Sequence, residues 1–334
     1  MAASALTRMI GQQAETLERL AGWDLSGPAA TLTAARRVIL VGTGTSQHAA
    51  ELGAMMLAEA GIDARWAASA TWARWSSGPR TDDAVLVITH TAETAYAARA
   101  RAIALEAGAG VLSITGAGRG WPEAIETVAP EESETYTVSY TSALAVLTRL
   151  AHEAGWPDGS AGQLRRAAAQ VREAVAEPAI GDVAFPARSL AIVGCGPWGV
   201  TAREGALKIR EGARMLAEGF DAERFLHGAA VPLTPADGVV LLEPRADADG
   251  LTAAVGEAAG REGIPVTALE AEAGGLPPLL AQIPMTVQLQ LLAERFSRLR
   301  RQDPDTVITG AWGDPGMWRL GMPANRRTNG AEMA

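Results

Sequence analysis

The sequence predicts an α/β fold of two related halves, each a mostly parallel sheet flanked by helices in a doubly wound, flavodoxin-like arrangement. Continuous apolar runs at residues 38–41, 84–88 and 110–115 alternate with segments of helical composition, which is the pattern of βαβ units. Runs without polar alternation indicate strands buried on both faces of a parallel sheet. Residues 187–196 then repeat the pattern of residues 35–44 without a gap, 152 positions later, so the same kind of domain begins twice.

The repeat divides the chain into domains, because a period of 152 residues is a domain length and far too long for a solenoid. We expect, in order, a helical lead-in at residues 1–30, a first domain at 31–160, a linker helix and loop at 161–185, a second domain at 186–310 and a C-terminal tail at 311–334. Helical composition predicts helices at residues 9–20, 48–60, 97–107, 162–176 and 201–217. The tail after Trp318 is expected to be mobile.

Composition and charge exclude several classes of protein. The chain is 48% hydrophobic with a net charge of −9 and no basic run, which disfavours nucleic-acid binding. Cys195 is the only cysteine, so an internal disulfide and a cysteine zinc site are excluded. No apolar stretch reaches the roughly 18 residues that a membrane helix needs, and residues 1–20 lack the apolar core of a secretion signal. We therefore expect a cytoplasmic protein without a metal or redox cofactor.

Hydroxyl-bearing residues cluster where three helices of the first half begin. The three clusters consist of Gly44, Thr45 and Ser46, then Thr89, His90, Thr91 and Thr94, and finally Ser139 and Thr141. Each cluster alone is also compatible with a tight turn or a helix cap. Hydroxyls and free N–H groups at successive helix starts can, however, bind phosphate oxygens at the carboxyl edge of an open sheet. We therefore predict a phosphate site from the three clusters together.

Residues 194–199 satisfy the G-x-G-x-x-G fingerprint of dinucleotide sites. The fingerprint is a weak signal unless a second strand follows and ends in an acidic residue roughly 20 positions further on. Here the sequence predicts a helix over residues 201–217, followed by a polar and irregular stretch. We therefore expect no nicotinamide cofactor.

Candidate catalytic residues follow in the second half. Glu204, Lys208 and Glu211 fall at i, i+4 and i+7, so they share one face of the predicted helix. A solvated salt-bridge ladder is the alternative, but Lys208 is the only lysine in a chain that otherwise uses arginine. His227 precedes Gly228 in a loop-like stretch, where a histidine is less often a core residue. Proton transfer between adjacent sugar carbons needs a carboxylate base, and ring opening needs an acid such as imidazole.

Taken together, these residues resemble the sugar-isomerase (SIS) domain family, in the tandem arrangement found in the isomerase half of glucosamine-6-phosphate synthase and in phosphosugar deaminases and deglycases. The resemblance covers roughly residues 5–305. Residues 43–46 resemble the family's C-G-T-S motif, 89–94 its S-Q-S-G-E-T motif, 204–211 its E-G-A-L-K-L-K-E motif and 225–228 its loop ending in H-G.

The resemblance implies that Glu211 is the proton-transfer base, that His227 opens the sugar ring and that Lys208 lies beside them. It also implies which residues hold the phosphate, namely Thr45, Ser46, Thr89, Thr91 and Thr94. The expected ligand is a sugar phosphate of the hexose or hexosamine 6-phosphate class. Family members commonly form homodimers, in which the histidine often comes from the neighbouring subunit.

Three departures from the family pattern narrow the expected reaction. The chain has no glutamine-hydrolysing domain and no N-terminal cysteine, so glutamine-dependent synthesis is not expected. Trp312 stands where relatives have a lysine that can form a Schiff base with a ketose. His90 and Ala92 replace Gln and Gly in the sugar loop, which suggests an altered substrate. We expect aldose–ketose isomerisation, or a deaminase or deglycase reaction on an amino-sugar phosphate, by acid–base proton transfer; the alternative is a non-catalytic phosphosugar sensor.

Overall fold

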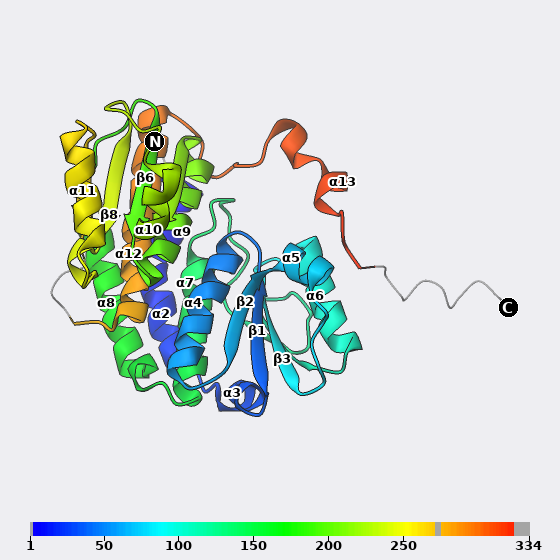
Figure 1. Ribbon diagram of the computed structural model, residues 1–334. Helices are drawn as coiled ribbons and strands as arrows, with labels where there is room; N and C mark the ends of the chain where they lie inside the picture. Colours follow the sequence, from blue (N-terminus) through cyan, green and yellow to red (C-terminus); the bar gives the residue numbers. More distant parts are fainter. Residues whose placement is uncertain (1–2, 271–274, 324–334) are drawn as a thin grey trace.

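The computed structural model describes residues 3–270 and 275–323, and it contains two parallel sheets with helices packed around them (Figure 1). The first sheet has the order β2-β1-β3-β4-β5, with β1 (Arg37–Gly42), β2 (Ala64–Ala68), β3 (Asp83–Ile88), β4 (Gly110–Thr115) and β5 (Ala124–Glu126). The second has the order β7-β6-β8-β9, with β6 (Ser189–Gly194), β7 (Leu216–Asp221), β8 (Gly238–Leu242) and β9 (Val266–Leu269). Neighbouring strands are parallel throughout both sheets. The predicted fold class is confirmed.

A layer of helices joins the two sheets. The helices of the first half and its lead-in are α1 (Ala5–Gly11), α2 (Gln13–Ala21), α3 (Ser26–Thr33), α4 (Thr45–Glu59), α5 (Ser69–Trp75), α6 (Ala95–Glu106) and α7 (Val138–Glu153). Those that follow are α8 (Ala161–Ala176), α9 (Pro197–Ala213), α10 (Ala222–Arg224), α11 (Leu251–Arg261), α12 (Pro278–Arg300) and α13 (Pro315–Trp318). Helices α2, α7, α8 and α12 lie between the sheets (Figure 1). None of the helices in the described part of the chain is both long and apolar enough to cross a bilayer.

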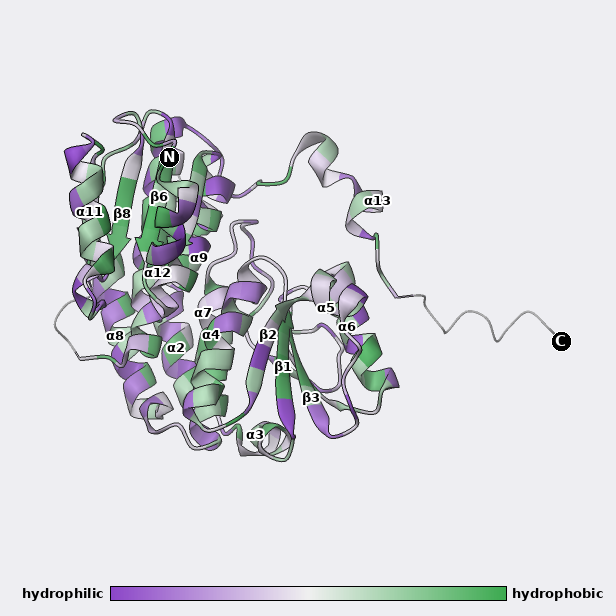
Figure 2. Cartoon of the chain, in the orientation of Figure 1, coloured by the Kyte–Doolittle hydropathy of each residue, from purple (hydrophilic) through white to green (hydrophobic). Residues whose placement is uncertain are grey.

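The helical layer forms one hydrophobic core that spans both halves. Leu17 of α2, Leu147 of α7, Leu164 of α8, Ile209 of α9 and Leu292 of α12 are all fully buried in the same cluster. Strands β6 and β8 are hydrophobic along their lengths (Figure 2), as expected of central strands covered on both faces. Because the core is continuous, the two sheets are fixed relative to each other and can share a site.

Each sheet carries the same arginine–aspartate clamp at its amino edge. In the first half the Arg36 guanidinium lies 2.6 Å from the carboxylate of Asp83, and in the second half Arg188 lies 2.6 Å from Asp237. Each aspartate also accepts a hydrogen bond from the backbone N–H three positions before it, at 2.9 Å and 2.8 Å. Arg36 and Arg188 are 152 positions apart, so the clamp follows the same duplication as the strand pattern.

Several elements differ from the sequence-based expectations. The helix predicted over residues 201–217 ends at Ala213, because Arg214 adopts a left-handed conformation with φ +47°. The polar stretch that follows contains strand β7, an edge strand that exposes Leu216 and Glu218. Alternating exposure and charge at a sheet edge hide such a strand from a search for continuous apolar runs. The short strands β2 and β5 escaped prediction as well, and the helix expected at residues 9–20 is divided between α1 and α2.

We predict that Asp237→Asn lowers the free energy of unfolding by about 1–3 kcal/mol at pH 7, because the buried side chain loses the charge that strengthens the hydrogen bonds it accepts. Hydrogen bonds from Arg188, Ser189 and Thr234 hold the pKa of Asp237 well below its ordinary value of 3.8. The ionised carboxylate of Asp237 therefore contributes its full stabilisation of the fold above pH 3.8, and this stabilisation is lost as the pH falls towards the lowered pKa. Urea unfolding at pH 7 and at acidic pH should show the difference from wild type shrinking below about pH 4. The control is Asp82→Asn in the first half, at the exposed aspartate next to Asp83, and it should change the free energy of unfolding little.

Candidate active site

A cavity of about 510 Å³ lies where the carboxyl edge of the first sheet meets α9. Its walls come from the loops after β1 and β3, the start of α7, one face of α9 and the C-terminal segment. The site residues predicted from the sequence that line it are Gly44, Thr45, Ser46, Thr89, His90, Thr91, Thr94, Ser139 and Glu211. Residues that are far apart in the sequence therefore meet in one cavity.

One side of the cavity, here called the hydroxyl wall, is arranged to receive a ligand. It consists of Thr45, Ser46, Thr89, Thr91, Thr94 and Ser139. Gly44 has φ +58° and ψ −128°, a conformation that other residues rarely adopt, and it directs the chain from β1 into the first turn of α4. The hydroxyl oxygen of Thr89 is buried without a hydrogen-bond partner among the described residues, which is costly unless a ligand or water supplies one. Ala92 has φ +57°, so the alanine that replaces the family's glycine occupies a backbone conformation that favours glycine.

His90 is held as a neutral ring in the cavity wall. Its Nε2 accepts a hydrogen bond of 3.2 Å from the backbone N–H of Glu131. Burial, with a contribution from the charge of Arg119, lowers the pKa of His90 to about 4. The ring packs against Gly116, where a Cβ atom would lie 2.7 Å from it. His90 therefore shapes the cavity and is not an acid at neutral pH.

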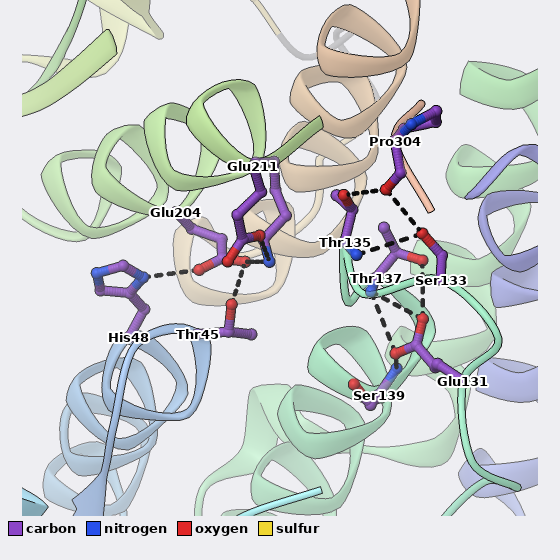
Figure 3. Close-up of polar contacts among 11 residues, drawn as sticks. Thr45, His48, Glu131, Ser133, Thr135, Thr137, Ser139, Glu204, Glu211 and Pro304 are labelled. Carbon is purple, nitrogen blue, oxygen red and sulfur yellow. Dashed lines mark hydrogen bonds and ion pairs between the residues drawn. The ribbon is translucent and has the colours of Figure 1, made fainter. Parts of the chain in front are cut away.

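The face of α9 that points at the cavity carries a buried ionic network (Figure 3). Lys208 is fully buried, with its Nζ 2.7 Å from Oε2 of Glu211 and 3.5 Å from Oε1 of Glu204. Glu204 is fully buried as well and interacts with two side chains of α4. The hydroxyl of Thr45 donates to its Oε1 at 3.1 Å, and Nδ1 of His48 lies 2.7 Å from its Oε2. The network therefore ties α9 of the second half to α4 of the first.

The network moves the pKa values of its two carboxylates in opposite directions. Burial alone would raise the pKa of Glu204, but the Lys208 charge and the hydrogen bonds from His48 and Thr45 lower it. Burial raises the pKa of Glu211 despite its contact with Lys208. Burial would lower the pKa of Lys208, but the charges of Glu211 and Glu204 outweigh it and raise that pKa. Divergent carboxyl pKa values are typical of acid–base sites, and Glu211 is the carboxylate exposed to the cavity.

Three predicted site residues do not line the cavity. Thr141 is fully buried and its hydroxyl donates to Oε1 of Gln13 at 2.9 Å, so its assignment to the phosphate site is corrected: it joins α7 to α2. Lys208 reaches the cavity only through Glu211. His227 lies in an exposed distorted turn, residues Phe225–Ala229, and is absent from the lining of the cavity in its own chain. Its predicted catalytic role, by way of a neighbouring subunit, stays a prediction.

The loop before α7 contributes residues that sequence reasoning missed. The carboxylate of Glu131 accepts hydrogen bonds from the backbone N–H groups of Thr137 and Ser139 (Figure 3). It therefore fixes the start of α7, where Ser139 enters the cavity. Glu134 and Tyr136 also line the cavity. The run of acidic residues here has the composition of a solvated loop, and no sequence signal indicated that it contacts residues about 170 positions away.

The C-terminal segment closes one side of the cavity. The backbone oxygen of Pro304 accepts hydrogen bonds from the hydroxyls of Ser133 and Thr135 (Figure 3). Farther along, the side chains of Val307, Ile308 and Trp318 line the cavity and provide an apolar wall opposite the hydroxyls. Trp312, which the resemblance places where relatives have a lysine, is largely exposed and does not line the cavity. Part of the tail predicted at 311–334, residues 324–334, lies outside the described residues.

The G-x-G-x-x-G turn of the second half has a different environment from its counterpart. The premise that no second strand follows was wrong, because β7 ends in Asp221. The carboxylate of Asp221 accepts a hydrogen bond of 3.2 Å from the N–H of Gly196, an amide that would otherwise be open to an anion. In the first sheet the strand position paired with Gly42 is Ala68, whereas in the second the position paired with Gly194 is Asp221. The first turn is thus open to a phosphate, and the second is covered by a carboxylate.

Comparison with known proteins agrees with this architecture. The sequence profile of the SIS domain matches residues 31–152 and 185–269. Glutamine–fructose-6-phosphate aminotransferase (isomerizing) of Thermococcus kodakarensis is 28% identical over 304 residues, which covers 80% of this chain and 50% of that protein. The same enzyme of Pyrococcus horikoshii is 30% identical over 298 residues, with the same two shares, 80% and 50%. The chain therefore spans about half the length of these curated relatives, and the domain boundaries predicted from the sequence stay predictions.

Solved structures share the fold. The C-terminal domain of glucosamine-fructose-6-phosphate aminotransferase from Francisella tularensis superposes with a TM-score of 0.79 at 16% identity, covering 91% of this chain and 98% of that one. Tagatose-6-phosphate ketose/aldose isomerase from Escherichia coli has a TM-score of 0.77 at 18% identity, with coverage of 92% and 98%. Glucosamine-6-phosphate deaminase from Thermotoga maritima has a TM-score of 0.72 at 16% identity, with coverage of 91% and 97%.

We predict that Lys208→Met lowers the free energy of unfolding by about 3–5 kcal/mol, because two buried carboxylates lose the cation between them. Urea unfolding followed by circular dichroism at pH 7 measures the loss. The double variant Glu204→Gln/Lys208→Met should recover part of it, since the fully buried charge is then removed together with its partner. A single variant as stable as wild type would show that the network contributes nothing to docking the two halves.

Proposed function

Because the chain belongs to the SIS domain family, we propose that its cavity binds a hexose or hexosamine 6-phosphate and transfers a proton between C1 and C2 of the open-chain sugar. The observation that carries the proposal is the position of Glu211. Its carboxylate faces the same cavity as the hydroxyl wall, its pKa is raised by burial, and its orientation is fixed by Lys208. A base of raised pKa next to a phosphate-binding wall is suited to abstracting a proton from a sugar carbon.

Binding in this scheme begins with the phosphate. The hydroxyls of Ser46, Thr89 and Thr94 would donate to its oxygens, together with N–H groups at the start of α4. The buried and unpartnered hydroxyl of Thr89 supports this assignment most directly. The remaining carbons of the sugar would then extend across the cavity towards α9, where Glu211 lies.

In the proposed reaction Glu211 removes the proton from C2 of the open-chain aldose, the electron pair of the C–H bond forms a C1–C2 double bond, and the C1 carbonyl oxygen takes up a proton to give an enediol. Glu211 then returns its proton to C1, while the C2 hydroxyl releases a proton that replaces the one taken up at the C1 oxygen, and the ketose forms. Lys208 holds Oε2 of Glu211 at 2.7 Å, which leaves the other carboxylate oxygen to act on the substrate. The same carbon-to-carbon transfer serves the removal of an amine from an amino-sugar phosphate.

Two observations favour a reaction that needs no Schiff base with an enzyme lysine, so that the substrate either carries its own nitrogen or needs none. Lys208 is the only lysine of the chain, and its raised pKa keeps it an ammonium between two carboxylates, so it is not a free amine for Schiff-base formation. By the family resemblance, Trp312 stands where relatives have the lysine that supplies one. We therefore propose aldose–ketose isomerisation, with deamination or deglycation of an amino-sugar phosphate as the second reaction of the same site.

We predict that Glu211→Gln reduces kcat/KM by about 10²–10⁴, the usual contribution of a positioned general base, while sugar-phosphate binding changes little. Turnover is measured on a panel of hexose and hexosamine 6-phosphates, and binding by isothermal titration calorimetry. Glu59→Gln, an exposed carboxylate at the end of α4 that does not line the cavity, is the control. Undiminished turnover in Glu211→Gln would contradict the assignment. Thermal stabilisation of the wild-type protein by a sugar phosphate without any product would instead favour the phosphosugar sensor.

A homodimer can be tested through complementation, since His227 does not line the cavity of its own chain. We predict that Glu211→Gln and His227→Ala are each impaired alone but regain about a quarter of wild-type activity when co-expressed, because half of the randomly formed dimers then hold one intact site. Ring opening by a second copy's imidazole is the physical reason. Unimpaired activity of His227→Ala alone, or no recovery on co-expression, would contradict a shared site.

A further inference from the structure

A second pocket, of about 200 Å³, lies along a face of α9 adjacent to the one at the substrate cavity, since Arg203 and Arg210 line it whereas Leu207 and Glu211 line the cavity. It shares no lining residue with that cavity. The residues that line it are His48, Arg203, Arg210, Glu218, Gly219, Phe220 and Arg224. Three guanidinium groups therefore face one carboxylate in a chain whose net charge is −9.

The arginines of the second pocket keep N–H donors that could bind a ligand. Arg203 and Arg210 are seven positions apart on α9, which places them on one face of the helix. The guanidinium of Arg203 lies 2.6 Å from the carboxylate of Glu51, and that of Arg210 donates to the backbone oxygen of Ala217 at 2.6 Å. A guanidinium has five N–H donors, so most of the donors of both groups stay available. Arg224 has no hydrogen bond or ion pair within the described part of the chain.

The floor of the pocket is formed by His48 and Phe220, each only 9% exposed. Because Nδ1 of His48 is engaged by Glu204 at 2.7 Å, its second ring nitrogen points away from Glu204 (Figure 3). The carboxylate of Glu218 is exposed at the same pocket and restricts it to ligands that can face both charges.

We propose that this pocket is a second anion site, which binds a small phosphate-bearing molecule separately from the substrate. Several guanidinium groups converging on one pocket match phosphate oxygens, which accept paired N–H donors from arginine forks. The proposal goes beyond the proposed reaction and does not depend on it.

The two anion sites are separated by a single buried side chain. Oε1 of Glu204 accepts from Thr45, which lines the substrate cavity, and Oε2 lies against His48, which lines the second pocket. The two pockets have no lining residue in common. The two sites can consequently be removed one at a time by substitution.

The test is a titration of the whole protein with inorganic phosphate, followed by isothermal titration calorimetry and ³¹P NMR. We expect two phosphate sites in the wild-type protein and one in Ser46→Ala/Thr94→Ala, in which the cavity wall is impaired. Adding Arg224→Gln to that variant should weaken the residual site by about tenfold or more, the effect of losing one charge-assisted interaction. Arg224 is exposed, so its replacement should leave the fold intact, as circular dichroism can verify.

Arg80→Gln is the matched control. Arg80 is exposed and lies just before β3, at the amino edge of the first sheet, and it lines neither pocket. The substitution should leave both sites unchanged. A parallel titration with glycerol 3-phosphate distinguishes the source of the phosphate: tighter binding than inorganic phosphate at the residual site identifies an organic ester, and equal binding identifies the free ion. The proposal is overturned if Ser46→Ala/Thr94→Ala removes all phosphate binding, or if the residual site is insensitive to Arg224→Gln.

Discussion

The structure depends on the burial of Lys208 between Glu204 and Glu211. Removing an ammonium and a carboxylate from water costs several kcal/mol for each ion, and here the cost is offset by contacts that come from both halves of the chain. Thr45 and His48 of α4 complete the environment of Glu204, while Lys208 fixes Glu211 on the cavity side. Because α4 belongs to the first half and α9 to the second, the network forms only when the halves are docked, and the position of the proposed base follows from that docking.

The two halves have kept the same frame and diverged in chemistry. Both retain the arginine–aspartate clamp at the amino edge of the sheet, and both have a glycine near φ +58° after the first strand, namely Gly44 and Gly196. The difference lies one strand away, where Ala68 leaves the first turn open and Asp221 covers the second. The first turn is therefore the one left open to the proposed phosphate, while the second half contributes charged side chains from α9.

Helix α9 separates two environments by its faces. Its Glu204, Lys208 and Glu211 side is buried against the substrate cavity, and its Arg203 and Arg210 side faces the second pocket. Helical periodicity makes this division possible, since residues seven positions apart return to the same side of the helix. One element thus holds the proposed base and the guanidinium groups at fixed relative positions.

The sequence by itself determined the parallel α/β architecture, the duplication and the helix that carries Glu204, Lys208 and Glu211, because continuous apolar runs and i, i+4, i+7 spacing are local properties. It also located the hydroxyl clusters, since each lies where a helix of the first half begins. Only the tertiary structure decided which members face the ligand: Thr141 turns to Gln13 in the core, and β7 is a strand although its exposed edge lacks an apolar run. The physical reason is that burial and pairing between residues distant in the sequence, 128 positions for Thr141 and Gln13 and 27 for β7 and β6, are set by packing, which leaves no periodic trace in the sequence.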